Sequence, residues 1–355
     1  MALLEVENLE TNFYTEEGVV KAVNDVSYEI EAGERFGVVG ESGAGKSVTS
    51  LSVMGLIENP GRIDGGEIRF KGENLLEVSE ERLQEIRGGE IAMIFQEPQS
   101  ALNPVYTVGE QIAEAIRTHM HLEDEAVRER AIDMLRRVGI PDPEERYHNY
   151  PHQFSGGMQQ RAVIAIALSC DPELIVADEP TTALDVTIEA QILELLEELS
   201  EEFGVAIQLI THDLGVVAEI CNRVMVMYAG KAVEKAPVEE LYYDPKHPYT
   251  VGLMGSIPRI GDGRERLDTI PGSMPDLVQL PPGCSFHPRC PYAEEACTQR
   301  EPPLVDVETG TPVEGLNGSE HTAACLEYTG ELQGELDFHV EVDENRDAGH
   351  EGADT

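Results

Sequence analysis

A glycine-rich segment at residues 40–47 restricts, more than any other feature, what this chain can fold into. It reads Gly-Glu-Ser-Gly-Ala-Gly-Lys-Ser, the phosphate-binding pattern G-x-x-x-x-G-K-S. Residues 35–39 before it are apolar like a buried strand, and residues 48–57 after it carry apolar side chains at helical spacing. A strand, a glycine-rich turn and a helix in this order distinguish a nucleotide site from an ordinary turn. The sequence therefore predicts an α/β fold that binds a nucleoside triphosphate at this turn.

The residue types in this segment suit a triphosphate. Glycines let the backbone wrap the phosphates without clashes from Cβ atoms, and the successive N–H groups and the start of the next helix attract an anion. We expect Lys46 to reach the terminal phosphates and Ser47 to provide its hydroxyl oxygen to Mg²⁺. The residues expected to contact the nucleotide are Gly40, Ser42, Gly43, Gly45, Lys46, Ser47 and Val48.

Three later apolar runs end in side chains suited to phosphate chemistry. Residues 91–95 end at Gln96, residues 174–177 lead into Asp178-Glu179, and residues 205–210 lead to His212. We expect Asp178 to hold Mg²⁺, Glu179 to polarise an attacking water, and His212 to contact the γ-phosphate. An acidic pair at a strand end or a lone histidine is more often structural. The shared placement after strands argues for function here.

A second glycine pair opens a helix at residues 159–168. Ser155 stands where an N-cap is expected, and Gly156-Gly157 follow it. The free N–H groups of such a helix start form a second anion site.

In this order the segments resemble the motifs of the ATP-binding cassette (ABC) ATPases, over residues 3 to about 235. The family signature, usually written LSGGQ, stands here as Phe154-Ser155-Gly156-Gly157-Met158. Its two outer residues depart from the general form, whereas Ser-Gly-Gly is intact. The other matches are the phosphate loop, the glutamine-loop Gln96, Walker B at 174–178 with Glu179, the D-loop Ala183-Leu184-Asp185 and the switch His212.

The resemblance implies a P-loop NTPase with a RecA-like core, an antiparallel β subdomain and a helical subdomain inserted at about 97–160. It also implies ATP hydrolysis, with Gln96 as a further Mg²⁺ ligand and Phe13, or else the neighbouring Tyr14, stacked on the adenine. In this family each ATP lies between one phosphate loop and the partner's signature. A chain with one cassette must therefore pair, with a paralogous ATPase subunit or with its own copy. The residues implied to act on the partner's nucleotide are Ser155, Gly156, Gly157 and Asp185.

Segments 95–111, 150–158 and 247–258 resemble the oligopeptide and dipeptide importer branch of this family. That branch implies two membrane permeases, an external substrate-binding protein and a peripheral position at the cytoplasmic face of the membrane. Close relatives that import nickel or oligosaccharides share these motifs, so they stay open as alternatives. A non-transport cassette protein of translation or DNA repair is a weaker alternative, because such proteins carry two cassettes or a long coiled-coil insertion.

Beyond residue 236 prolines become frequent and helical periodicity fades. We divide the chain into a nucleotide domain at 1–235, an irregular extension at 236–329 and an acidic, disordered tail at 330–355. The extension carries Cys284, Cys290, Cys297 and Cys325. A cytosolic location argues against disulfides, and spacing alone allows zinc or an iron–sulfur cluster. Residues 283–290 resemble peptide-importer ATPases whose extension holds a [4Fe–4S] cluster, which favours the cluster over zinc.

The charge balance excludes some partners. The formal net charge is −43, from 68 acidic and 25 basic residues, which disfavours nucleic acid and anionic lipid as partners. Yet 41% of the residues are hydrophobic, so we expect a folded protein adapted to molar salt, from a halophilic source. The apolar runs are too short to cross a bilayer, and no signal segment opens the chain, so a cytosolic location is expected.

Overall fold

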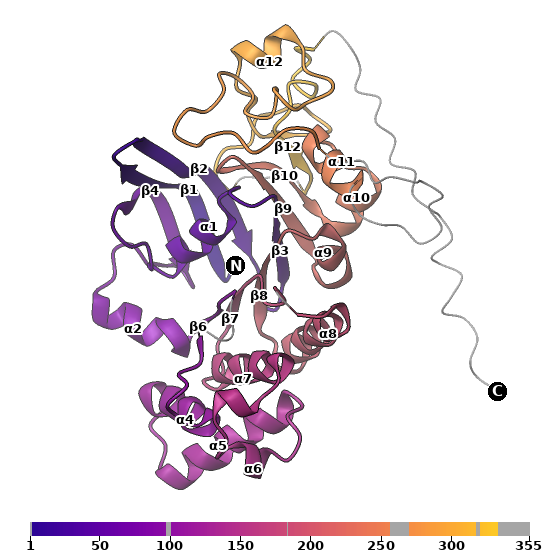
Figure 1. The fold of residues 1–355 in the computed structure, drawn as a ribbon. Coiled ribbons are helices and arrows are strands. Elements are labelled where there is room, and N and C mark those ends of the chain that lie inside the picture. The colour runs from indigo at the N-terminus through magenta and orange to yellow at the C-terminus, as the bar shows by residue number, and fades with distance from the viewer. Residues whose placement is uncertain (1, 97–100, 183, 256–269, 317–319, 333–355) are drawn as a thin grey trace, which may run out of the picture.

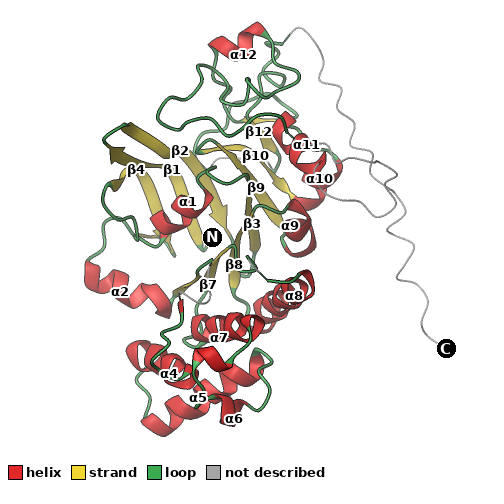
Figure 2. Ribbon diagram, viewed as in Figure 1, coloured by secondary structure: helices red, strands yellow, loops and turns green. Residues whose placement is uncertain are grey.

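The computed structural model describes residues 2–96, 101–182, 184–255, 270–316 and 320–332. Two β-sheets form its centre (Figures 1 and 2). A four-stranded antiparallel sheet has the order β2-β1-β4-β5, and an eight-stranded sheet has the order β11-β12-β10-β9-β3-β8-β7-β6. The first sheet consists of β1 (Leu4–Thr15), β2 (Gly18–Ile30), β4 (Gly61–Phe70) and β5 (Glu73–Asn74). The second consists of β3 (Arg35–Val39), β6 (Ile91–Ile94), β7 (Leu174–Asp178), β8 (Ala206–Thr211), β9 (Arg223–Tyr228), β10 (Lys231–Pro237), β11 (Val305–Asp306) and β12 (Thr322–Ala323).

The parallel part of the larger sheet places the functional segments at one edge. β3 lies between β8 and β9, and β7 lies between β6 and β8, all four pairs being parallel. The register pairs Val39 with Thr211, Ala177 with Leu209, and Ile94 with Ala177. Because the strands are parallel and in this register, the chain leaves β3, β6, β7 and β8 on the same side of the sheet.

The two faces of β3 serve two separate cores, as the alternation of a strand requires. Phe36 and Val38 belong to a cluster shared with the antiparallel sheet, where Tyr28 stacks on Phe36 with ring centroids 5.3 Å apart. Val39 belongs to the other cluster, shared with the helices. Burial on both faces explains why β7 and β8 read as continuous apolar runs.

Helices surround the sheets in two groups (Figure 1). A lobe at the lower end holds α4 (Val108–His119), α5 (Asp124–Arg137), α6 (Pro143–Arg146), η1 (Pro151–Gln153) and α7 (Gly156–Leu168). The remaining helices in the part of the chain that the structure describes are α1 (Lys46–Val53), α2 (Glu80–Gly89), α8 (Val186–Phe203), α9 (Leu214–Ile220), α10 (Val238–Tyr243), α11 (Pro248–Gly255) and α12 (Glu295–Gln299). None of the helices in the described residues is long and apolar enough to cross a membrane.

The C-terminal extension is joined to the central sheet. β12 pairs antiparallel with β10, with Glu234 opposite Ala323. The carboxylate of Glu234 is fully buried. It accepts hydrogen bonds from the backbone N–H groups of Lys246 (2.6 Å) and His247 (2.9 Å) and pairs with His321. The extension is therefore fixed to the cassette by backbone pairing and by a buried carboxylate.

Both candidates for adenine stacking, Phe13 and Tyr14, lie within a strand, because β1 runs to Thr15. The structure departs from the sequence expectation in the extension, which was expected to be irregular. α10 and α11 follow residue 236, where helical periodicity fades. Both are short helices with residues buried against the rest of the molecule, so packing rather than an extended apolar pattern determines them. Several of the segments named above fall outside the described residues: 97–100, Ala183, 256–258 and most of the acidic tail, 333–355.

Candidate nucleotide site

The phosphate loop has the backbone shape that its glycines predict. Gly45 precedes α1 with φ of 104°, and a Cβ atom there would lie 2.3 Å from the carbonyl oxygen of Ala22. A Cβ atom on Gly40 would lie equally close, 2.3 Å, to the carbonyl oxygen of Met227. Neither position accepts a side chain without moving backbone atoms. Ser42 and Gly43 are exposed at the tip of the loop, and Val48 is half-buried in α1.

Lys46 lies inside the loop. It is 5% exposed, and its Nζ donates hydrogen bonds to the carbonyl oxygens of Gly40 (2.7 Å) and Glu41 (3.2 Å). Burial lowers the pKa of this ammonium, and the nearby carboxylates of Glu179, Asp178 and Glu41 oppose that shift. The loop thus encloses a cation whose protein partners are carbonyl oxygens, which suits exchange for phosphate oxygens.

Ser47 meets the end of β7. Its Oγ donates a hydrogen bond of 3.0 Å to Oδ1 of Asp178, although 131 positions separate the two residues. Asp178 is almost fully buried, and this burial raises the pKa of its carboxyl group, while the Ser47 hydrogen bond opposes the rise. A hydroxyl and a carboxylate oxygen in contact are the hard ligands that Mg²⁺ prefers. These two residues therefore fit a magnesium ion.

Glu179 gathers three further groups at the next position. Its Oε2 accepts hydrogen bonds from Nε2 of Gln96 (2.8 Å) and Oγ1 of Thr182 (2.9 Å), and its Oε1 lies 3.5 Å from Nδ1 of His212. The backbone of Glu179 has φ of 46°, unusual for a residue with a side chain, and its N–H is held by the carbonyl oxygen of Ile210 at 2.9 Å. The structure thus brings Gln96, Glu179 and His212 together, as expected from three strand ends.

The signature residues lie at the start of another helix. Ser155 is the N-cap of α7, and its hydroxyl accepts a hydrogen bond from the N–H of Met158 at 3.3 Å. A Cβ atom on Gly157 would lie 2.8 Å from Cγ2 of Ile188 in α8, so this glycine is needed for close packing. Asp185 is the N-cap position of α8, with no side-chain cap hydrogen bond.

This second helix start is separate from the phosphate loop. α7 packs against β6, α4, α5 and α8, whereas α1 packs against β1, β2 and β7. The two helices accordingly appear in different parts of the ribbon (Figure 2). The structure brings together the loop, Walker B, Gln96 and His212, and it leaves Ser155, Gly156, Gly157 and Asp185 as an exposed or half-buried second group.

The two aromatic candidates for adenine stacking differ in their surroundings. The Tyr14 hydroxyl donates to Asp64 at 2.8 Å, and the guanidinium of Arg62 lies 5.5 Å from its ring centroid. Phe13 is half-buried beside Gly61, where a Cβ atom would lie 2.8 Å from its Cε1.

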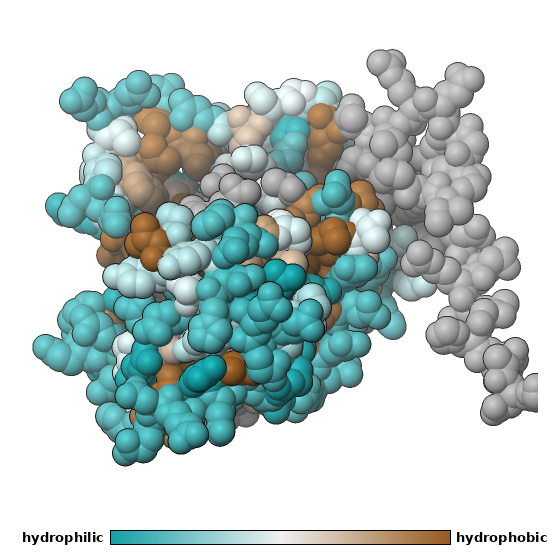
Figure 3. Space-filling view, turned by 60° about the horizontal axis from the view of Figure 1, so that its bottom comes forward, coloured by the Kyte–Doolittle hydropathy of each residue, from teal (hydrophilic) through white to brown (hydrophobic). Residues whose placement is uncertain are grey.

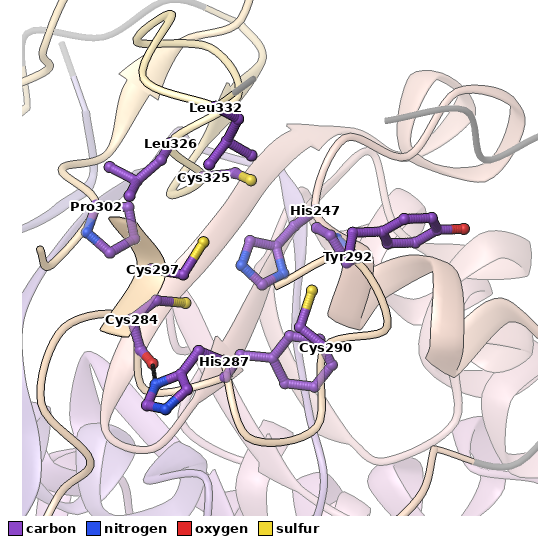
Figure 4. Close-up of a pocket in the computed structure, with 12 residues that line it drawn as sticks. His247, Cys284, His287, Cys290, Tyr292, Cys297, Pro302, Cys325, Leu326 and Leu332 are labelled. Atoms are coloured by element: carbon purple, nitrogen blue, oxygen red, sulfur yellow. Dashed lines mark hydrogen bonds between the residues drawn. The ribbon is translucent and has the colours of Figure 1, made fainter. Parts of the chain in front are cut away.

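The four cysteines of the extension line one cavity (Figure 4). The cavity measures about 20 Å³, and His247 and Phe286 also contribute to its wall. All four thiols are free of disulfide bonds. Burial raises the pKa of Cys284, that of Cys290 to about 11 and that of Cys325 to about 12. Within the described ranges, no group of three or more His, Cys, Asp or Glu side chains has the geometry to hold a metal ion.

Four residues near the site were not expected from the sequence. Thr182, which donates a hydrogen bond to Glu179, follows the Walker B segment by only a few positions. Its nearness in sequence to Glu179 could have identified it. Glu41 occupies a position that the G-x-x-x-x-G-K-S pattern leaves unspecified. Its partners Tyr249 and Arg289 lie 208 and 248 positions further along the sequence. No local pattern connects them.

Together, the sheet order, the loop and the strand-end residues define a P-loop ATPase of the cassette type. Comparison with protein families agrees: residues 23–182 match the family described as ABC transporter, and residues 233–297 match the oligopeptide/dipeptide transporter C-terminal region. The chain belongs to the ATP-binding cassette transporter ATPases and is an ATPase of that family. The expected fold is thereby confirmed.

Individual relatives cover nearly the whole chain. The probable peptide ABC transporter ATP-binding protein y4tR of Sinorhizobium fredii is 52% identical, over 91% of this chain and 94% of that protein. The dipeptide transport ATP-binding protein DppD of Escherichia coli is 50% identical, over 86% of this chain and 93% of its own length.

Solved structures match the cassette portion. The dimeric ATP-binding cassette MJ0796, in a post-hydrolysis state bound to ADP and Pi, has a TM-score of 0.60 at 27% identity, covering 66% of this chain and 98% of that one. The cbiO1 protein of Clostridium perfringens, part of the ABC transporter complex cbiONQ, has a TM-score of 0.60 at 28% identity, covering 68% and 91%.

Proposed function

We propose that this chain is the ATP-hydrolysing subunit of a membrane importer for dipeptides or oligopeptides. The observation that carries this proposal is the junction of Gln96, Glu179 and His212 beside the Ser47–Asp178 pair, in a chain half identical to peptide-import ATPases along most of its length. The geometry of the site supports ATP hydrolysis. The similarity to peptide-import ATPases supports the transport role and the class of cargo.

The site residues divide the chemical work between them. The N–H groups of the loop and the ammonium of Lys46 bind the phosphates. Ser47, Asp178 and Gln96 supply oxygen ligands for Mg²⁺, which neutralises charge on the phosphates when bound. Glu179 accepts the proton of the attacking water, and His212 contacts both Glu179 and the γ-phosphate. Phe13 is the stacking partner of the adenine, because Tyr14 already engages Asp64.

The separation of the two helix starts supports hydrolysis between two subunits. Ser155, Gly156, Gly157 and Asp185 lie away from the chain's own loop, where they are free to meet a partner's γ-phosphate. MJ0796, the similar cassette, forms a dimer. We propose a paralogous ATPase subunit as the partner, with a second copy of this chain as the alternative.

The permeases are expected to meet the lobe of α4–α7. Figure 3 turns this end toward the viewer, and its surface is mainly hydrophilic with separate hydrophobic patches. Val105 and Tyr106, before α4, are among the most exposed large apolar side chains, at 71% and 52%. Two adjacent apolar side chains kept in water suit contact with a permease loop. This contact would hold the protein at the cytoplasmic face of the membrane.

We retain the division into a nucleotide domain at 1–235, with its helical part at about 97–160, an extension at 236–329 and a tail at 330–355. The antiparallel pairing of β12 with β10 supports an extension that depends on the cassette for its fold. We also propose that the charge of −43 reflects adaptation to high salt.

The convergence of the four cysteines in one cavity supports a metal centre in the extension, and its binding would have to draw their thiols closer together than they lie in this structure. Four thiolates are the usual ligands of a [4Fe–4S] cluster, and they also suit zinc. Burial raises the pKa values of Cys284, Cys290 and Cys325, so a bound cation would have to displace the protons of these three thiols. The raised pKa values therefore predict binding that strengthens with pH.

Anaerobic purification tests the metal centre. Iron with acid-labile sulfide and broad absorption near about 400 nm is expected. Stoichiometric zinc, or no metal in anaerobically prepared protein, would contradict the iron–sulfur proposal.

The transport role is tested through the binding protein that would serve the importer. Genes for two permeases and one binding protein are expected beside the gene for this chain, and the purified binding protein should bind dipeptides or oligopeptides. Binding of nickel or oligosaccharides instead would contradict the peptide cargo and leave the ATPase assignment intact.

A further inference from the structure

One residue of the phosphate loop is held by the C-terminal extension. The guanidinium of Arg289 makes two parallel bonds to the carboxylate of Glu41, Nη1 to Oε2 at 2.6 Å and Nη2 to Oε1 at 3.0 Å. The Arg289 side chain is 4% exposed, and its Nε donates to the carbonyl oxygen of Pro271 at 2.8 Å. A bidentate pair whose guanidinium is buried is strong and fixes direction as well as distance.

Tyr249 holds the backbone of the same loop residue. Its hydroxyl accepts a hydrogen bond of 2.8 Å from the N–H of Glu41. The ring is fully buried and packs edge-on against Tyr228, with centroids 4.7 Å apart, and against Phe286, at 5.4 Å. Because the Tyr228 and Phe286 rings hold the Tyr249 ring in place, its hydroxyl sets the orientation of the peptide between Gly40 and Glu41.

The held residue is also a partner of Lys46. The ammonium of Lys46 donates to the carbonyl oxygen of Gly40, in the same peptide whose N–H binds Tyr249, and to the carbonyl oxygen of Glu41, in the next peptide. Glu41 is therefore bonded through its carboxylate, its N–H and its carbonyl group. Moving the peptide at 40–41 would move the lysine that is expected to bind the phosphates.

We propose that Arg289 and Tyr249 are positioning residues for the phosphate loop, through which the C-terminal extension sets the affinity of the site for MgATP. This inference rests on the proposed nucleotide site. The competing interpretation is that the pair only fastens the extension to the cassette. A fastening role predicts lower thermal stability with unchanged nucleotide affinity, whereas a positioning role predicts weaker binding in a protein that remains folded.

The test measures MgATP binding by calorimetry on the full-length chain. Arg289→Met should raise the Kd about tenfold, which corresponds to about 1.4 kcal/mol, because it removes both charged hydrogen bonds to Glu41. Arg289→Lys should fall between it and wild type, because an ammonium keeps the charge and loses the bidentate geometry. Tyr249→Phe should raise the Kd roughly threefold, the size expected for one neutral hydrogen bond. The KM for ATP should rise with the Kd and change more than kcat.

A matched control comes from the same extension. Arg300 forms an exposed ion pair with Glu331 at 2.5 Å. Because this pair does not involve the phosphate loop, Arg300→Met should leave the Kd at the wild-type value. In a Glu41→Gln background, Arg289→Met should change the Kd much less than it does alone, because the two act as a pair.

Two results would overturn the inference. One is an Arg289→Met protein whose Kd equals that of Arg300→Met while wild type binds MgATP. The other is full additivity of Arg289→Met with Glu41→Gln. If Arg289→Met does not fold, Arg289→Lys and Tyr249→Phe decide between the same outcomes. Failure of wild type itself to bind MgATP would instead refute the proposed function, so the two failures are distinguishable.

Discussion

At the scale of single residues, Glu179 concentrates the chemistry of the site. Its carboxylate receives hydrogen bonds from Gln96 and Thr182 and faces His212, and its positive φ separates its direction from that of Asp178, which meets Ser47. Two adjacent carboxylates therefore face two different sets of partners. This arrangement allows one to bind a cation while the other handles a proton.

Replacing Glu179 by Gln should separate binding from hydrolysis. The amide keeps the shape of the side chain and cannot accept the proton of water, so turnover should fall roughly 10²–10⁴-fold, the usual contribution of a general base. MgATP binding should persist, and a closed dimer should accumulate on size-exclusion chromatography. Glu198→Gln, on the exposed face of α8, is the matched control and should keep wild-type turnover. Normal turnover in Glu179→Gln would refute the assignment of the base.

Cys221 gives a prediction about pH. This thiol lies at the end of α9, and burial raises its pKa from 9.0 to about 12. Between these two values the unfolded chain loses the proton while the folded chain keeps it, so folding stability falls as the pH rises above 9. The loss should reach about 1.4 kcal/mol at pH 10 for this group.

The measurement is the free energy of unfolding by urea at pH 8 and pH 10. The decrease between these pH values should be smaller in Cys221→Ala than in wild type by that amount, whatever the packing cost of the substitution. Equal decreases in the two proteins would show that the thiol titrates alike in the folded and unfolded chains.

At the scale of elements, two helices offer the same N-cap with different surroundings. Ser155 caps α7 and Thr107 caps α4, each accepting a hydrogen bond from the backbone N–H three residues later, at 3.3 Å and 3.2 Å. The local contribution of each cap to stability is therefore similar. Only the start of α7 carries the glycine pair proposed to meet a partner's nucleotide.

Ser155→Ala and Thr107→Ala should therefore lower stability alike and differ in assembly. Each should cost about 1 kcal/mol of unfolding free energy through loss of the cap. Ser155→Ala should in addition prevent the ATP-dependent dimer in a Glu179→Gln background, which sedimentation velocity can measure. Equal dimerisation of both variants would contradict the proposed role of the signature.

At the scale of the whole molecule, one sheet unites the cassette and the extension. The order β11-β12-β10-β9-β3 runs from the extension to the strand that precedes the phosphate loop. The extension also reaches that loop through Arg289 and Tyr249. The extension is therefore connected to the nucleotide site in two ways, by backbone pairing within the sheet and by side-chain hydrogen bonds to the loop.

Net charge is the other property of the whole molecule, and it predicts salt-dependent folding. With a charge of −43, self-repulsion should destabilise the fold in dilute buffer. In 1 M salt the screening length falls to about 3 Å, which removes most of this repulsion. The folded fraction, followed by circular dichroism, should rise as the KCl concentration is increased from about 0.1 M to about 2 M. Sorbitol at equal osmolality should stabilise less. Full stability in dilute buffer would contradict adaptation to salt.

The sequence by itself determined the parts of this protein that depend on neighbours along the chain. Residues 35–57 contain their own strand, turn and helix, and the apolar runs ending at Gln96, Asp178 and His212 identified the strand ends. Since parallel strands place their carboxyl ends at one edge, such runs suffice to predict that these side chains meet. The order of motifs completed the family assignment.

The tertiary structure alone decided the contacts between distant segments. The tertiary structure forms the bond of Arg289 to Glu41, the contact of the Tyr249 hydroxyl with the same loop residue, the burial of Glu234 and the common cavity of four cysteines. These contacts join residues up to 248 positions apart. Neither periodicity nor spacing encodes such pairs, because they arise only when the completed sheet brings the extension over the phosphate loop. The physical reason is that side-chain packing depends on the whole fold, whereas strands, turns and helix starts are specified largely by adjacent residues.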